Sequence, residues 1–70
     1  MIPWNEVMHA FQFCHGGDLA ALHPVSLKVL ALWSRDLLSV QDFIRLFGLP
    51  DSSNIGIGEC MVQYLSWPSA

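Results

Sequence analysis

The stretch SVQDFIRLFGLP, residues 39–50, decides the fold class because it contains a complete helix signal. Ser39 is a favoured N-cap residue, and Asp42 stands three positions later, where its side chain can reach back to the cap as in a capping box. Gly48 ends the helical spacing, and Pro50 prevents its continuation. The stretch therefore predicts an amphipathic helix. Its apolar face consists of Val40, Phe43, Ile44 and Phe47.

The preceding segment, PVSLKVLALWS at residues 24–34, predicts a second helix that is apolar nearly all round. Pro24 suits the first helical position because its fixed φ is already helical. Lys28 and Ser26 are the main polar interruptions. A helix of this kind is central or lies in an interface. The short segment SRDLL connects it to the next helix.

Residues 3–15 predict the first helix of the chain, with Pro3 at its start and Gly16 and Gly17 as its stop. One apolar stripe recurs at helical spacing. It consists of Trp4, Val7, Met8, Phe11 and Cys14. Residues 18–23 then form a linker with room for one helical turn, which Asp18 can cap.

Residues 51–65 hold the most ambiguous pattern. Asp51, Ser52 and Ser53 are all good caps. Apolar and polar residues beyond them keep helical spacing, but Gly56 and Gly58 each oppose a helix by about 1 kcal/mol. We expect a loop to about residue 54 and then a helix to about residue 65, with a strand over residues 54–58 as the alternative.

These elements predict an all-α fold, a compact bundle of about four short helices in a single small domain over residues 1–70. The expected core comprises Trp4, Val7, Met8, Phe11, Val29, Leu30, Trp33, Phe43, Ile44, Phe47, Val62 and Leu65. The 70 residues are 53% hydrophobic and 13% charged, so a small interior cannot hide every apolar side chain. Exposed apolar patches mark contact sites. We therefore expect a homo-oligomer or a protein partner.

The charge distribution argues against nucleic-acid binding. The net charge is −3, and Lys28, Arg35 and Arg45 are the three basic residues. Phosphate neutralisation supplies most of the affinity for nucleic acids. Residues 39–65 have the rough shape of a helix-turn-helix, but the segment after the turn contains no lysine or arginine, so a DNA-binding regulator is a disfavoured alternative. No candidate membrane span is free of charges, and the N-terminal stretch does not resemble a signal peptide.

The segment FQFCHGGDL, residues 11–19, invites a catalytic interpretation because Cys14 stands beside His15. Neighbouring helix residues point about 100° apart, so this pair cannot readily hydrogen-bond. We expect Cys14 to pack in the core, and we expect it and Cys60 to be reduced thiols rather than a disulfide. Histidine and cysteine spacings predict no metal site, and the glycines of GIGEC predict no nucleotide loop. We expect no catalytic residue and no cofactor.

Partner binding is the remaining class of function, and large aromatic residues are its usual anchors. Phe13 is the first candidate because it lies off the apolar stripe of its helix. The full set of expected partner-binding residues is Phe13, Trp67, Leu27 and Tyr64.

Two segments resemble one group of small phage tail assembly chaperones. PWNEVM, residues 3–8, is similar to the P-W-x-x-[LV]-M opening of that group, and ALHPVSLKVLAL, residues 21–32, resembles the A-L-T-P-x-E-L segment that follows it. His23 and Ser26 depart from that pattern at its threonine and glutamate. The resemblance covers residues 3–32 and implies a non-enzymatic protein that binds the tape-measure or tail-tube protein during assembly.

The combined expectation is a non-catalytic protein-binding module, an assembly chaperone or adaptor of a phage or mobile element. It would act in the cytoplasm of a bacterial or host cell through an apolar helical surface. A small inhibitor of a larger protein machine is the alternative.

Overall fold

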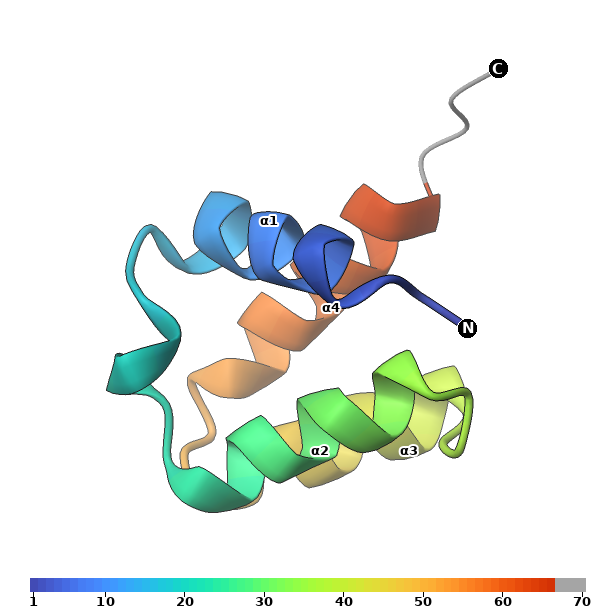
Figure 1. Ribbon diagram of the computed structural model, residues 1–70. Helices are drawn as coiled ribbons and strands as arrows, with labels where there is room; N and C mark the ends of the chain where they lie inside the picture. The colour runs from blue at the N-terminus through green and yellow to red at the C-terminus, as the bar shows by residue number, and fades with distance from the viewer. Residues whose placement is uncertain (67–70) are drawn as a thin grey trace.

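The computed structural model describes residues 1–66 and confirms the all-α fold (Figure 1). The α-helices are α1 (Trp4–His15), α2 (Pro24–Ser34), α3 (Val40–Phe47) and α4 (Asn54–Ser66), and a single 3₁₀ turn, η1 (Leu19–Ala21), lies between α1 and α2. The alternative of a strand over residues 54–58 is wrong, since these residues form the first turns of α4.

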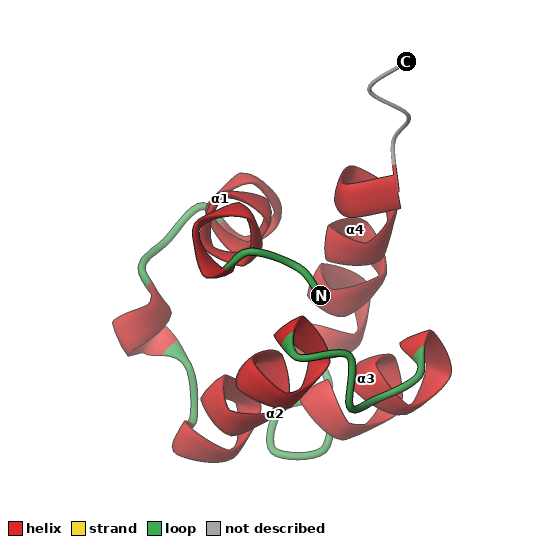
Figure 2. Cartoon of the chain, turned by 45° about the vertical axis from the view of Figure 1, so that its right-hand side comes forward, coloured by secondary structure: helices red, strands yellow, loops and turns green. Residues whose placement is uncertain are grey.

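The helices pack as two pairs joined through α4. Helices α2 and α3 lie side by side, and α1 lies on α4 (Figure 1). Helix α4 also contacts α3, so it links the two pairs, whereas α1 and α2 touch each other over a smaller area. The second view shows α1 above α2, with α4 rising beside α1 from its lower end near α3 (Figure 2).

The helix ends largely follow the sequence signals. Gly16 takes the left-handed conformation with φ of 81° and ends α1. The Asp18 carboxylate caps η1 by accepting a hydrogen bond from the backbone of Ala20 at 3.0 Å. The Ser39 hydroxyl caps α3 by accepting from the Asp42 N–H at 3.1 Å. The Asp42 side chain, however, does not reach back to the cap; it accepts from Arg45 at 3.3 Å.

The core lies where the two helix pairs meet. Its buried apolar residues are Val7, Ala10, Phe11, Val29, Leu30, Trp33, Phe43, Phe47 and Met61. Burial of each phenylalanine contributes about 1.5–3 kcal/mol to folding.

Part of the expected core is wrong. Trp4 stands in the first turn of α1, where its side chain is 39% exposed. Met8 is only half-buried, whereas Ile44, Val62 and Leu65 are half-buried but pack against the core as expected. Ala10 and Met61 are fully buried instead, because their positions face the seam between α1 and α4.

A small buried polar network joins three helices. The Asn54 amide donates to the Phe47 carbonyl and to the Ser26 hydroxyl, both at 3.3 Å, and Ser26 donates to the same carbonyl at 3.3 Å. Carbonyl groups at the end of a helix have no partner within that helix. Ser26 of α2 and Asn54 of α4 therefore both donate hydrogen bonds to the buried Phe47 carbonyl at the end of α3.

Two glycines are required by close packing rather than by their own backbone angles. Gly48 follows α3 with φ of −88°, which is not left-handed. A Cβ atom there would collide with the side chain of Ile55. Gly58 lies inside α4, where a Cβ atom would come within 3.3 Å of the Phe47 ring. The tight contact between α3 and α4 explains why α4 keeps a residue that weakens a helix.

Cys14 and Cys60 form a disulfide between α1 and α4, so the expectation of reduced thiols is wrong. The antiparallel pairing of these helices brings the two Cα atoms to 5.8 Å, a usual distance for a disulfide. The bond closes a loop between residues 46 positions apart. A loop of that length stabilises the folded chain by about 4 kcal/mol in the chain-entropy model. Such a covalent link is the kind of support that a small domain needs.

Candidate protein-binding surface

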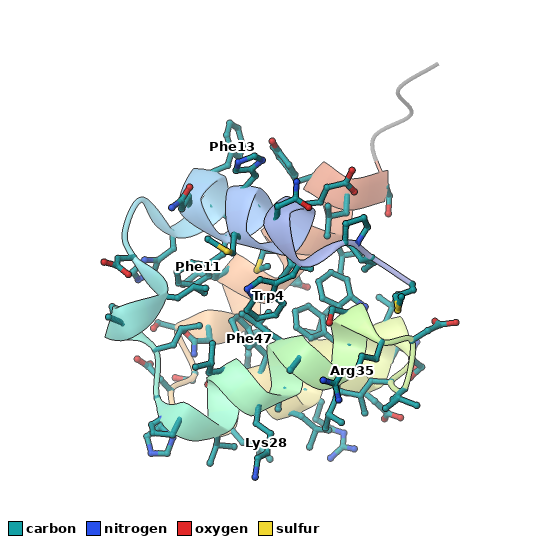
Figure 3. All side chains as sticks on the ribbon, viewed as in Figure 1. Trp4, Phe11, Phe13, Lys28, Arg35 and Phe47 are labelled. Carbon is teal, nitrogen blue, oxygen red and sulfur yellow. A yellow bond between two sulfur atoms is a disulfide. The ribbon has the colours of Figure 1, made fainter. Side chains whose placement is uncertain are left out.

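An exposed aromatic pair lies across α1 and α4. The rings of Phe13 and Tyr64 have centroids 5.0 Å apart and planes inclined by 37°. Phe13 is 72% exposed and Tyr64 is 41% exposed. Figure 3 shows Phe13 pointing away from the body of the molecule. Two of the four expected partner-binding residues, Phe13 and Tyr64, are therefore neighbours in space. We call these two residues the aromatic pair.

Helical periodicity explains how the aromatic pair reaches the surface. On α1, the fully buried residues Val7, Ala10 and Phe11 form the inner stripe. Successive helix residues are rotated by about 100°, so Phe13 lies about 110° round the helix from the centre of that stripe, on its flank. On α4, Tyr64 lies one turn after Cys60 on the same side of the helix, because residues four apart are neighbours on a helix surface. The disulfide from Cys14 to Cys60 thus joins neighbouring turns of the same two helices.

The other two expected residues are not joined to this pair. Leu27 is 38% exposed, but it belongs to α2, and Phe13 points away from that helix in Figure 3. Trp67 lies outside the described residues. The structure therefore assembles a candidate surface from Phe13 and Tyr64 alone.

Other large apolar side chains are also exposed, but they are spread over several elements. They are Met1, Trp4, Val25, Leu27, Leu37, Val40, Leu49 and Ile55. Sequence reasoning missed Trp4, which it placed in the core. Its position at the very start of α1, before the first fully buried residue Val7, is the signal that would have shown it.

A shallow apolar cleft of about 280 Å³ opens where the N-terminal segment meets the end of α4. Ile2, Trp33, Val62 and Leu65 contribute its apolar walls, and Glu6 is the charged side chain at its edge. The backbone N–H of Ile2 donates to the Ser34 carbonyl at 2.9 Å and holds the N-terminal segment along this cleft.

A second hollow of about 370 Å³ is more polar and lies beside the starts of α2 and α4. His15, His23 and Asp51 line it, yet each already has a structural role. His15 stacks on Phe11 with ring centroids 4.7 Å apart, and the His23 Nδ1 atom accepts from the N–H of Val25 at 3.1 Å. Hydrogen bonds from the Ser53 hydroxyl and backbone lower the pKa of Asp51.

Charges divide unequally between the two helix pairs. Between Trp4 and His15 in α1 and between Asn54 and Ser66 in α4, the acidic residues are Glu6 and Glu59, and neither helix contains a lysine or an arginine. The basic residues Lys28 and Arg45 lie on α2 and α3, and Arg35 follows α2 directly (Figure 3). The two helices that bear the aromatic pair therefore carry acidic residues and no lysine or arginine.

The described residues offer little for metal or thiol chemistry. Across residues 1–66, no three histidine, cysteine or carboxylate side chains gather as they would around a metal ion. Both cysteines are bonded to each other, so neither sulfur is a free nucleophile in this structure. In the same part of the chain, every helix is too short or too polar to cross a bilayer.

No protein-family model, curated protein or solved structure matches this chain.

Proposed function

We propose that this protein is a non-catalytic binding module that recognises a protein partner through the aromatic pair on α1 and α4. The observation that carries the proposal is the contact between Phe13 and Tyr64, two exposed rings 5.0 Å apart on helices tied by a disulfide. Exposed rings in contact with each other form a ready apolar anchor, and aromatic residues dominate interface hot spots.

Rigidity supports the same proposal. A side chain that is already held in place loses less entropy on binding. Phe13 and Tyr64 have two rotatable side-chain bonds each, and they stand on helices that the Cys14–Cys60 bond joins. The pair is therefore preorganised for a partner.

Charge indicates the chemistry of that partner. The two helices that bear the aromatic pair carry the acidic residues Glu6 and Glu59 and no lysine or arginine. Complementary interfaces place opposite charges across the contact. The partner surface would thus have an apolar centre that receives the two rings and a rim with lysine or arginine. An amphipathic helix with a basic rim fits this description.

The resemblance of residues 3–32 to small phage tail assembly chaperones agrees with such a surface. We propose on this basis that the partner is a tape-measure or tail-tube protein. Chaperones of this kind act by covering apolar segments, and no catalytic group or cofactor enters the proposal.

The test compares Phe13→Ala and Tyr64→Ala with Leu49→Ala, a control that shortens another apolar side chain at 66% exposure. Partners recovered from the source cell are identified by mass spectrometry, and their affinity is measured by calorimetry. Self-association is measured by light scattering. Loss of a hot spot worth about 2 kcal/mol weakens binding about 30-fold. We expect this for both ring variants, with helical circular dichroism unchanged.

The control Leu49→Ala should bind as the wild type does. Added salt should weaken the complex, because it screens the acidic residues of α1 and α4. Equal affinity of the wild type and both ring variants, for the recovered partner and for self-association alike, would refute the proposal.

A further inference from the structure

The Cys14–Cys60 disulfide lies close in sequence to both members of the aromatic pair. Cys14 directly follows Phe13 on α1, and Cys60 precedes Tyr64 by one turn on α4. The covalent link between the helices therefore joins the turn of α1 that bears Phe13 to the turn of α4 that precedes Tyr64.

The rest of α1 is held to the bundle at a different place. Its fully buried residues Val7, Ala10 and Phe11 all precede Cys14 in the chain. In the last turn, Phe13 is mostly exposed, and His15 stacks on Phe11 of its own helix rather than on α4. The last turn of α1 is joined to α4 by the Cys14–Cys60 bond and by the contact between the Phe13 and Tyr64 rings, and Cys14 itself is half-buried against the core.

Both cysteines are only half-buried, so a small dithiol can reach the bond. A thiolate of the reductant attacks one sulfur, breaks the Cys14–Cys60 bond and forms a mixed disulfide. The second thiol of the reductant then displaces that sulfur and closes the reductant's own disulfide. Cys14 and Cys60 gain two electrons and two protons together, and the dithiol loses the same number.

We propose that the Cys14–Cys60 disulfide is a redox switch for the partner-binding surface. In the oxidised protein the bond holds Phe13 against Tyr64, and the surface is ready to bind. Reduction frees the last turn of α1, the two rings separate, and affinity for the partner falls. The buried residues of α1 keep the remainder of the helix in place. This inference rests on the proposed function for its binding consequence.

The redox state of the surroundings would decide whether the disulfide is present. Reducing compartments keep most protein thiols free, and disulfides there are usually transient or sensing. A protein exposed to both conditions would bind its partner in the oxidised state and release it in the reduced state.

The first test needs no partner. Nuclear Overhauser contacts between the Phe13 and Tyr64 rings are measured in air-oxidised protein and in protein reduced with dithiothreitol. We expect these contacts to vanish on reduction. Reduction also removes the stabilisation of about 4 kcal/mol that the closed loop supplies, so amide exchange accelerates through the whole chain and is not the readout. The contact between the Trp33 and Phe43 rings should persist in the reduced protein, because it lies between α2 and α3. Unchanged contacts between the Phe13 and Tyr64 rings on reduction, or loss of both pairs of contacts together, would overturn the switch.

Two variants supply the controls. The double variant with Cys14→Ser and Cys60→Ser should behave as reduced protein under both conditions. If it does not fold, the double variant with Cys14→Ala and Cys60→Val is used, because it replaces the half-buried sulfur with apolar groups. Persistent contacts between the rings in a folded variant that lacks the bond would refute the proposal.

The binding arm separates the two proposals. Partner affinity is measured for oxidised and reduced wild type and for oxidised Phe13→Ala. We expect the reduced wild type and the oxidised Phe13→Ala to bind equally weakly. If Phe13→Ala binds as well as the wild type, the proposed function fails, whereas the ring contacts still decide the switch. If Phe13→Ala binds weakly and reduction leaves wild-type affinity unchanged, the switch fails alone.

Discussion

The ring of Phe43 stacks on the indole of Trp33, with centroids 3.8 Å apart and planes inclined by 8°. This contact fastens α3 to α2, and Phe47 adds a further ring at 5.2 Å from Phe43. Replacement of a buried phenylalanine by alanine removes about 3–5 kcal/mol. A domain of this length has a total stability of about 3–10 kcal/mol. We therefore expect Phe43→Ala to remove about half of the stability or more, as measured by urea denaturation followed by circular dichroism.

The milder variant Phe43→Leu should stay folded and lose about 1–2 kcal/mol in urea denaturation. Phe13→Ala is the matched control, because the same substitution at an exposed ring changes stability by about 0.5 kcal/mol or less. A large loss of stability in Phe13→Ala would place that ring in the core instead.

The Asn54 amide offers a second prediction, since it satisfies the Phe47 carbonyl and the Ser26 hydroxyl at once. Asn54→Ala leaves that carbonyl with Ser26 alone, and we expect a loss of about 1–3 kcal/mol in urea denaturation. Asn54→Asp keeps the shape of the side chain, but an ionised carboxylate can only accept hydrogen bonds and so cannot bond to the Phe47 carbonyl, which is itself an acceptor. It should destabilise more at pH 7 than at pH 3, where a protonated acid can donate. Asn5→Ala, at an exposed position on α1, is the control and should be close to neutral.

Two glycines should respond to alanine with opposite signs. Gly48→Ala puts a Cβ atom into the Ile55 side chain, and overpacking of this kind costs about 1–3 kcal/mol. Gly56 lies in α4 with nothing within 4 Å of an added Cβ atom. Gly56→Ala should therefore stabilise the protein by about 0.5–1 kcal/mol through helix propensity. Thermal unfolding measures both.

The Ile55→Ala variant tests the physical cause of the Gly48 effect. The combination of Gly48→Ala with Ile55→Ala should lose less stability than the sum of the two single variants, because the colliding atoms are gone. An additive result would show that Gly48 is required for some other reason.

Local signals predicted most of the fold. Proline starts, glycine stops and the Ser39 cap act within a few residues of the helix end that they define, so the sequence contains them in full. The outward direction of Phe13 was also readable, because it follows from the spacing of Val7 and Phe11 on the same helix.

The features that the sequence did not reveal depend on contacts between helices. The meeting of Cys14 with Cys60 requires α1 and α4 to be antiparallel neighbours, and nothing within either segment states this. Tyr64 joins Phe13 for the same reason. Gly48 suggested a left-handed helix end, yet its purpose is the approach of Ile55 from the following helix. Trp4 matched the apolar spacing but lies where α1 extends beyond its first fully buried residue.

The turn before α4 gives a prediction about pH. The Ser53 hydroxyl donates to the Asp51 carboxylate at 2.8 Å and the Ser53 backbone donates at 3.0 Å, and these bonds hold the pKa of Asp51 below its ordinary value. A group whose pKa is lowered on folding stabilises the native state above its unfolded pKa and loses that contribution as pH falls through its folded pKa. Asp51 therefore makes the protein more stable at neutral pH than in acid.

Ser53→Ala removes the stronger cause and leaves the backbone bond, so the pKa of Asp51 should rise part of the way towards its ordinary value. The carboxyl carbon of Asp51 is followed by NMR through an acid titration. Ser52→Ala is the matched control, because the Ser52 side chain makes no hydrogen bond to Asp51 and its removal should leave the titration unchanged. If both variants titrate as the wild type does, the Ser53 hydroxyl has no role in the stability of this turn at neutral pH.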